Sequence, residues 1–165
     1  MDRDTLLAVV DFSRMRLLAT LESIEKSGQD PAKVLAWRPG PGRAHIAWQA
    51  MHCAATHDRY FNASLLKRPV HDESLVANYA GGSVPSDDNV PNLALIRDKL
   101  AVAFEPFRKY LADQTPASLQ TLMPAPGGKQ RTLAETFILL AWHETHHQGQ
   151  IHITWNLYRA SHGLA

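Results

Sequence analysis

The chain has 165 residues and a formal net charge of +1, with 45% hydrophobic and 20% charged residues. This composition is typical of a globular protein, and the length predicts a single domain over residues 1–165. The sequence contains no cluster of Lys and Arg residues of the kind that predicts nucleic-acid binding. It also contains no apolar run that approaches the ~18 residues of a membrane span. The polar start has no signal-peptide pattern, and the single cysteine, Cys53, excludes an internal disulfide framework. We therefore expect a cytoplasmic protein without a nucleic-acid or membrane partner.

The first predicted helix covers residues 4–27. Its apolar residues recur at steps of three and four, as on the buried face of a helix: Leu6, Val9, Val10, Phe12, Met15, Leu17, Leu18 and Leu21. Asp2 or Asp4 can cap its first turn. Residues 28–43 are expected to form a connection without a helix, because two X-Pro steps and two glycines lie within residues 37–42.

The second predicted helix covers residues 43–67 and is alanine-rich. It is apolar almost all round, which predicts deep burial, and Pro69 ends it. Residues 68–90 have the composition of a loop. A connection of this length is often a lid or a crossover, and we expect residues 70–89 to form the wall of a pocket.

The third predicted helix covers residues 91–114 and starts at Asn89 or at the Val90-Pro91 step. Pro106 lies inside its apolar pattern, so a kink or break is expected near Phe104.

Residues 115–131 are predicted to be irregular, with a short hairpin around Ala125 to Lys129. The last predicted helix covers residues 132–160 and begins with a capping box from Thr132 to Glu135. Four helices and a long connection predict an all-α four-helix bundle.

The last helix carries a histidine pair on the stripe that should face the core. His143 and His147 are one turn apart and point the same way, a spacing that lets two imidazoles share a metal ion. Burying two imidazoles without partners would be unfavourable, and a metal ion offsets that cost. His146 is interpreted as outward-facing or as a supporting group. Gly149, in mid-helix, is expected to permit a close approach of another helix.

A metal site needs a third ligand, which in a bundle comes from a facing helix. The second helix offers His45, His52 and His57, and His52 is nearest to the middle of that helix. Any one of these histidines alone could be a satisfied core or surface residue. The sequence favours a metal site because both helices carry histidines on faces that must pack together.

The same stretch contains the H-E-x-x-H pattern of zinc peptidases, with Glu144 as the general base. Two features argue against a peptidase. No Asp or Glu follows Gln148, and Gly149 and His152 each come one residue too early for the variant with a later histidine ligand. No strand precedes the motif to pair with a peptide substrate. Glu144, His57 and His146 remain candidates for a general base.

Three segments together resemble the DinB/YfiT family of metal-binding four-helix proteins: Trp37–Arg43, Ile46–His52 and His143–Ile151. The resemblance implies an up-down bundle with a long crossover. It also implies a divalent metal on His52, His143 and His147, and homodimers. Characterised members of the family include S-transferases and isomerases that use low-molecular-weight thiols.

Three neutral imidazoles leave a divalent ion with an open position, as in catalytic zinc sites. We expect one ion per chain, Zn or Ni first, although histidine ligation also admits Fe, Mn or Cu. The expected function is a metal-dependent hydrolase, or a thiol-dependent S-transferase or isomerase, acting on a small molecule. The alternative is a non-catalytic, stress-related protein that binds a metal or small molecule.

Overall fold

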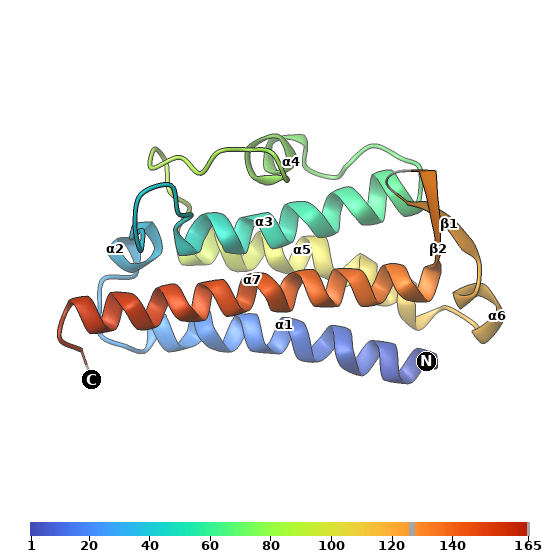
Figure 1. Ribbon diagram of the computed structural model, residues 1–165, viewed down its shortest axis with the longest axis horizontal. Coiled ribbons are helices and arrows are strands. Elements are labelled where there is room, and N and C mark those ends of the chain that lie inside the picture. The colour runs from blue at the N-terminus through green and yellow to red at the C-terminus, as the bar shows by residue number, and fades with distance from the viewer. Residues whose placement is uncertain (126–127, 165) are drawn as a thin grey trace.

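The computed structural model describes residues 1–125 and 128–164, and four long helices dominate it (Figure 1). They are α1 (Arg3–Glu25), α3 (Ile46–Asp58), α5 (Leu93–Ala112) and α7 (Leu133–Ser161). A π-helical segment, η1 (Arg59–Leu65), continues α3. The predicted all-α four-helix bundle with a long connection is confirmed.

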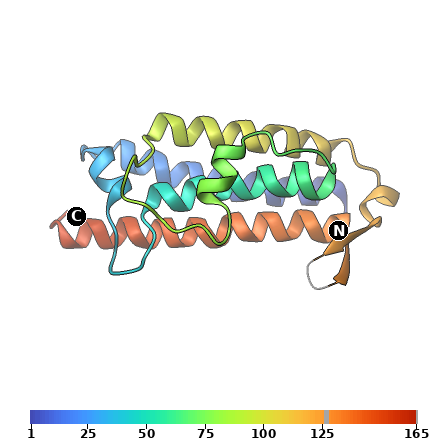
Figure 2. The ribbon, with the colours of Figure 1, turned by 90° about the horizontal axis from the view of Figure 1, so that it is seen from above.

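Each long helix packs against two others, in the cyclic order α1, α7, α3, α5. α1 and α7 run in one direction, and α3 and α5 run together in the other (Figures 1 and 2). Because α3 and α5 are parallel, residues 66–92 between them must return along the bundle. This crossover carries a short helix, α4 (Glu73–Tyr79), over α3.

Three short helices lie where the sequence predicted only irregular chain: α2 (Pro31–Ala36), α4 and α6 (Pro116–Leu119). Each begins after a capping residue whose side chain accepts a hydrogen bond from a backbone N–H in the first turn. The capping residues are Asp30, Asp72 and Thr115, respectively. In α2 and α6 a proline occupies the first turn, where its missing N–H needs no partner. The prediction that residues 28–43 contain no helix is therefore wrong, because Pro31 starts a helix there.

Side-chain caps also set the ends of the long helices. Asp2 caps α1 as predicted, and the ring Nδ1 of His45 accepts the Trp48 N–H at 3.0 Å, so α3 begins at Ile46. α5 is capped by Asn92 rather than starting at residues 89–91, and it continues unbroken through Pro106.

A two-stranded hairpin stands at the end of the bundle where α7 begins (Figure 1). Strand β1 (Leu122–Ala125) pairs antiparallel with β2 (Lys129–Thr132), which confirms the predicted hairpin. Its residues 126 and 127 lie outside the described chain. The capping box of Thr132 and Glu135 then starts α7, as predicted.

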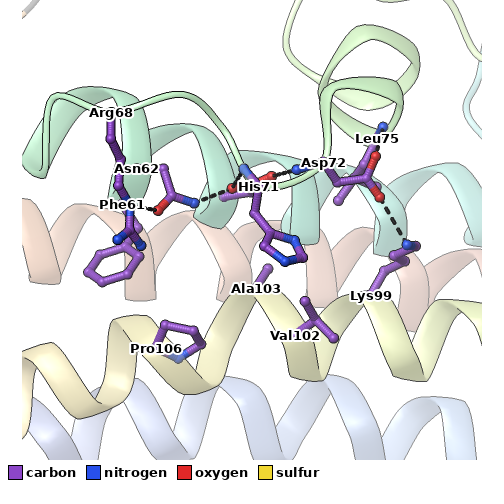
Figure 3. A pocket seen from close by; sticks show the side chains of 11 residues that line it. Phe61, Asn62, Arg68, His71, Asp72, Leu75, Lys99, Val102, Ala103 and Pro106 are labelled. Atoms are coloured by element: carbon purple, nitrogen blue, oxygen red, sulfur yellow. Dashed lines mark hydrogen bonds and ion pairs between the residues drawn. The ribbon is translucent and has the colours of Figure 1, made fainter.

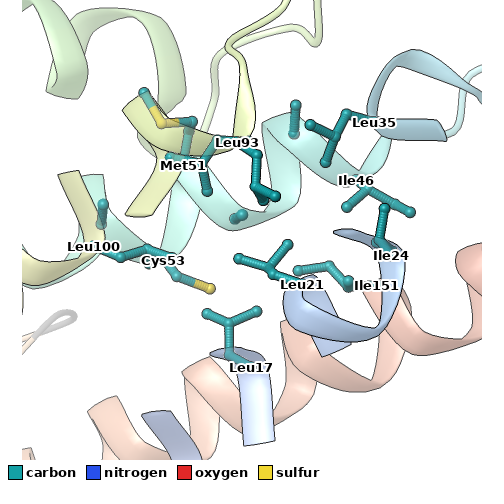
Figure 4. Close-up of a cluster of buried hydrophobic side chains, with 14 of the residues drawn as sticks. Leu17, Leu21, Ile24, Leu35, Ile46, Met51, Cys53, Leu93, Leu100 and Ile151 are labelled. Carbon is teal, nitrogen blue, oxygen red and sulfur yellow. The ribbon is translucent and has the colours of Figure 1, made fainter. Parts of the chain in front are cut away.

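The core consists of two apolar clusters with a polar layer between them. The larger cluster fills the end of the bundle near α2 and includes Leu21, Ile46 and Ile151 (Figure 4). The smaller cluster, centred on Phe107 and Phe137, fills the end near the hairpin. Arg14, His57, Glu144 and their neighbours occupy the level between the two, and each of these three is at most 5% exposed.

Candidate metal centre

His52 on α3 and the pair His143 and His147 on α7 converge between these two helices. Their ring centroids are 4.5 to 4.9 Å apart. One nitrogen from each ring lies within 4.8 Å of the other two. The structure thus brings together the three histidines that the sequence selected, from segments about 90 residues apart.

Hydrogen bonds at the far side of two rings fix which nitrogen is free. His52 Nδ1 lies 2.6 Å from the carbonyl oxygen of Tyr79, and His147 Nδ1 lies 2.5 Å from Gln49 Oε1. Because both partners are acceptors, each Nδ1 carries the proton, and each Nε2 keeps its lone pair. His52 Nε2 faces His143 Nε2 at 3.1 Å. The free Nε2 of His52 therefore points at the His143 ring, in the direction in which a shared metal ion would lie.

This arrangement fits a divalent metal ion. Bonds of about 2.0–2.1 Å in a tetrahedral zinc site place ligating nitrogens about 3.4 Å apart, close to the spacing found here. Three histidines fill three positions and leave the fourth for a water or substrate.

The electrostatics of the cluster favour neutral imidazoles. Burial, followed by the neighbouring histidines, lowers the pKa of His143 to about 3 and that of His147 to about 3. Burial also lowers the pKa of His52, against the opposing effect of its bond to Tyr79. Neutral rings are the form that binds a metal, so at neutral pH the cluster needs no deprotonation before binding.

The crossover holds the Tyr79 carbonyl in place. The buried Asp58 carboxylate accepts the backbone N–H groups of His71 and Asp72, each at 2.8 Å. Asp72 also forms a 2.9 Å ion pair with Lys99 on α5 (Figure 3). These contacts tie the start of α4 to both α3 and α5, and the last residue of α4 is Tyr79. The crossover therefore orients one ring of the cluster through the Tyr79 carbonyl. Its residues His71, Asp72 and Leu75 line a different cavity, and a pocket wall formed by residues 70–89 at the metal site stays a prediction.

Glu144 and His57, the two candidate catalytic residues, lie together in the polar layer. Arg14 Nε and a terminal nitrogen donate to the two carboxylate oxygens of Glu144 at 2.5 and 3.1 Å. Arg14 also donates to His57 Nδ1 at 3.2 Å and to the Leu100 carbonyl at 2.5 Å. Burial, and then Arg14, lower the pKa of His57 well below its usual value. Glu144 and His57 thus both contact the buried guanidinium of Arg14. Their catalytic role stays a prediction.

The remaining histidine candidates are not members of the three-histidine group, although the His146 ring lies 5.1 Å from that of His147. His45 caps α3 and its Nε2 lies 2.9 Å from the Ser86 carbonyl oxygen, while His146 is exposed and stacks on Trp142. Gly149 faces outward, and a Cβ built on it would meet nothing within 4 Å. The expectation that Gly149 permits a close approach of another helix is therefore wrong within this chain.

A cavity of about 420 Å³ lies beside the cluster. Gln49 and Gln150, whose amide oxygens both contact His147 Nδ1, line it. Arg43 and the apolar side chains Ile153 and Leu157 complete this mixed lining. A volume in this range is typical of a pocket for a small molecule.

Comparison with known proteins agrees with this geometry. Residues 10–151 match the DinB superfamily, so the chain belongs to that family. A conserved protein of Enterococcus faecalis, known from its crystal structure, has the same fold with a TM-score of 0.73. It is 17% identical, and the match covers 95% of this chain and 97% of that one. No curated protein matches the sequence. Among the described helices, none combines the length and apolarity that crossing a membrane requires.

Sequence reasoning missed three residues around the site. Gln49 comes three residues before His52, a spacing that places it on the same helix face and could have identified it. Arg14 lies four residues after Val10 and three before Leu17, on an apolar stripe where a charge predicts a buried partner. Tyr79 contributes only its backbone carbonyl, so no side-chain pattern signals it.

Proposed function

We propose that His52, His143 and His147 bind one divalent metal ion through Nε2, with zinc or nickel as the first candidates. The convergence of one ring nitrogen from each histidine, with the Nδ1 atoms of His52 and His147 held by acceptors, supports this assignment. We further propose a metal-dependent enzyme, a hydrolase or a thiol-dependent S-transferase or isomerase. A bound ion supplies a Lewis acid that lowers the pKa of a water or a thiol toward neutrality.

The side chains around the ligands would orient the rings and position the substrate. Trp48 stacks on His52 at 4.9 Å between ring centroids, which helps to hold the imidazole plane. Gln49 fixes His147 and also lines the adjacent cavity. We propose that this cavity, which borders the Nδ1 side of His147, binds a part of the substrate or cosubstrate remote from the metal, where Arg43 and the glutamine amides supply polar contacts.

Elemental analysis of the purified protein tests the metal centre. We expect about one divalent ion per chain and its loss in His147→Ala. His152→Ala is the matched control, because His152 lies on the same helix, is exposed and is not a member of the three-histidine group. Full metal occupancy in His147→Ala would disprove the assignment.

A screen of the metal-loaded protein with esters and with thiol cosubstrates separates the two reaction classes. Turnover of esters that His147→Ala abolishes indicates a hydrolase, and thiol-dependent turnover indicates a transferase or isomerase. Absence of turnover across both sets favours the second candidate, a non-catalytic protein that binds a metal or small molecule.

A further inference from the structure

A second, basic cleft lies between η1 and the hairpin. It has a volume of about 310 Å³, and Arg59, Lys67 and Arg131 line it together with hydroxyl-bearing and apolar side chains. None of the described residues that line it is acidic. None of the three basic side chains forms an ion pair with an acidic residue in the described chain. Three uncompensated positive charges around one cavity favour an anionic ligand.

The backbone at Lys67 supports a functional reason for this lysine. Its φ of 53° lies in the left-handed region, which glycine adopts far more readily than other residues. Lys67 follows the end of η1, where Leu66 N–H donates to Phe61 O at 3.0 Å and Arg68 N–H donates to Asn62 O at 3.1 Å. This is a helix end of the kind that glycine usually completes. A lysine kept in a glycine-type conformation indicates that its side chain is used.

The π-helical geometry of η1 is a second local irregularity at the same place. Such segments are rare and occur often at functional sites. η1 supplies Arg59, Tyr60, Ser64 and Leu65 to the cleft, and the hairpin supplies the opposite wall. The π-helical turn, the left-handed backbone at Lys67 and the basic side chains are therefore all found at one cavity.

The cleft lies on the same seam between α3 and α7 as the histidine cluster. Arg59 comes seven residues after His52, and Thr136, which lines the cleft, comes seven residues before His143. Seven residues are two helical turns, so each pair shares a helix face with an axial separation of about 10 Å. Since α3 and α7 are antiparallel, both steps lead from the cluster toward the hairpin end.

We propose that the cleft binds the oxyanion, a carboxylate or a phosphate, of a small ligand whose other end reaches the histidine cluster. Arg59, Lys67 and Arg131 supply the positive charge, and Leu65 and Met123 pack against the carbon skeleton. Anion binding does not depend on a metal, whereas the reach to the histidines rests on the proposed metal centre.

The anion site is tested by measuring the binding of phenyl phosphate and of phenylacetate to the metal-free protein by titration calorimetry. We expect at least one of the two anions to bind. Benzyl alcohol, which is uncharged, should not bind. The stronger of the two anions identifies the oxyanion class. Lys67→Gly and Arg131→Gln should each weaken binding at least 10-fold. Lys67→Gly should leave the melting temperature unchanged or raised, because glycine relieves the left-handed backbone.

Lys109→Gln is the control, since it removes one exposed positive charge from α5 that does not line the cleft and that is paired with Asp113. Equal weakening in Lys109→Gln, or equal affinity in Lys67→Gly and the wild type, would overturn the anion site. So would absence of binding by both anions. His147→Ala should retain anion binding, which separates a failure of this site from a failure of the metal centre.

The reach to the cluster is tested on zinc-loaded protein with two thiol carboxylates. Mercaptooctanoate with a terminal thiol spans about 10 Å, the axial separation of the two sites, and mercaptopropionate is much shorter. We expect the longer acid to bind at least 10-fold more tightly, and Lys67→Gly to remove this advantage while keeping its zinc. An advantage that persists in Lys67→Gly would come from the alkyl chain and would overturn the link between the sites.

Discussion

Arg14 determines how the polar layer of the core is neutralised. Its guanidinium contacts both oxygens of Glu144, the ring of His57 and a carbonyl of α5. It also lies 4.2 Å from the centre of the Phe104 ring. Glu144 follows the ligand His143 directly, so this ion pair holds the turn of α7 that carries the metal cluster. Removing one partner alone leaves a buried charge without compensation.

Arg14→Met should therefore lower the free energy of unfolding by about 3–5 kcal/mol. The double variant Arg14→Met with Glu144→Leu should recover most of this loss, because no buried charge remains. Urea denaturation of the wild type, both single variants and the double variant gives the four free energies of unfolding of this double-mutant cycle. Losses that simply add in the double variant would show that the two side chains do not stabilise each other.

Among the elements, the crossover connects the fold to the site. Asp58 is 3% exposed and binds two backbone N–H groups at the start of α4, while the end of α4 presents the Tyr79 carbonyl to His52. The position of the crossover and the orientation of one metal ligand are thus set by the same short helix. The crossover, whose sequence is typical of a loop, therefore orients the ring of one metal-ligand candidate.

Asp58→Ala should loosen this element without unfolding the bundle. We expect faster amide hydrogen exchange over residues 68–80 and metal affinity reduced by about 10-fold or more, as for other groups that orient metal ligands. Asp88→Ala, an exposed change in the same crossover, should alter neither quantity. Unchanged exchange in Asp58→Ala would mean that the carboxylate does not anchor the crossover.

At the scale of the whole molecule, buried neutral histidines make stability depend on pH. Burial lowers the pKa of His45 and, more strongly, that of His57, which are 1% and 2% exposed. In the unfolded chain both titrate near pH 6.5. Between the lowered folded pKa and that value the unfolded state binds more protons, so stability falls as the pH falls below about 6.5.

Metal-free protein should consequently be most stable above about pH 6.5. Each of the two histidines should contribute at most about 1.4 kcal/mol of lost stability per pH unit below it. Urea denaturation at several pH values measures the slope. His57→Gln should reduce this slope, whereas His152→Gln, at an exposed position, should leave it unchanged. Equal slopes in the two variants would contradict the assignment.

The outer faces of α1 and α7 carry exposed large apolar side chains, among them Phe12, Met15, Trp142 and Ile153 at 51–61% exposure. Trp142, Gly149 and Ile153 follow one stripe of α7, and Gly149 leaves room for another backbone to approach. We propose that a second copy of this chain packs on this face to form a homodimer.

Light scattering should then give twice the 18.4 kDa mass of the chain. The double change Trp142→Gln with Ile153→Gln should yield the monomer. Val84→Gln, which alters an equally apolar and exposed residue in the crossover, should remain dimeric. A wild-type protein that is monomeric at every concentration would exclude this interface.

Local signals were enough to predict the four long helices. The Asp2 cap, the capping box of Thr132 and Glu135 and the apolar stripes all act between residues close in the chain. The short helices α2 and α4 were missed because prolines and glycines within or beside them suggest loops. Their formation depends on single capping aspartates and on packing against α3.

The sequence by itself determined the bundle and the pairing of His143 with His147, because one helical turn fixes that spacing. For the third ligand, helix pattern alone offered His45, His52 and His57, and the mid-helix place of His52 and the family resemblance favoured His52. The tertiary structure decided among them: α3 and α7 cross so that His52 meets the pair, while His45 caps α3 and His57 joins Arg14. It also placed Glu144 beside Arg14, 130 residues away in the chain. Contacts between distant segments depend on how the helices pack, which no local pattern encodes.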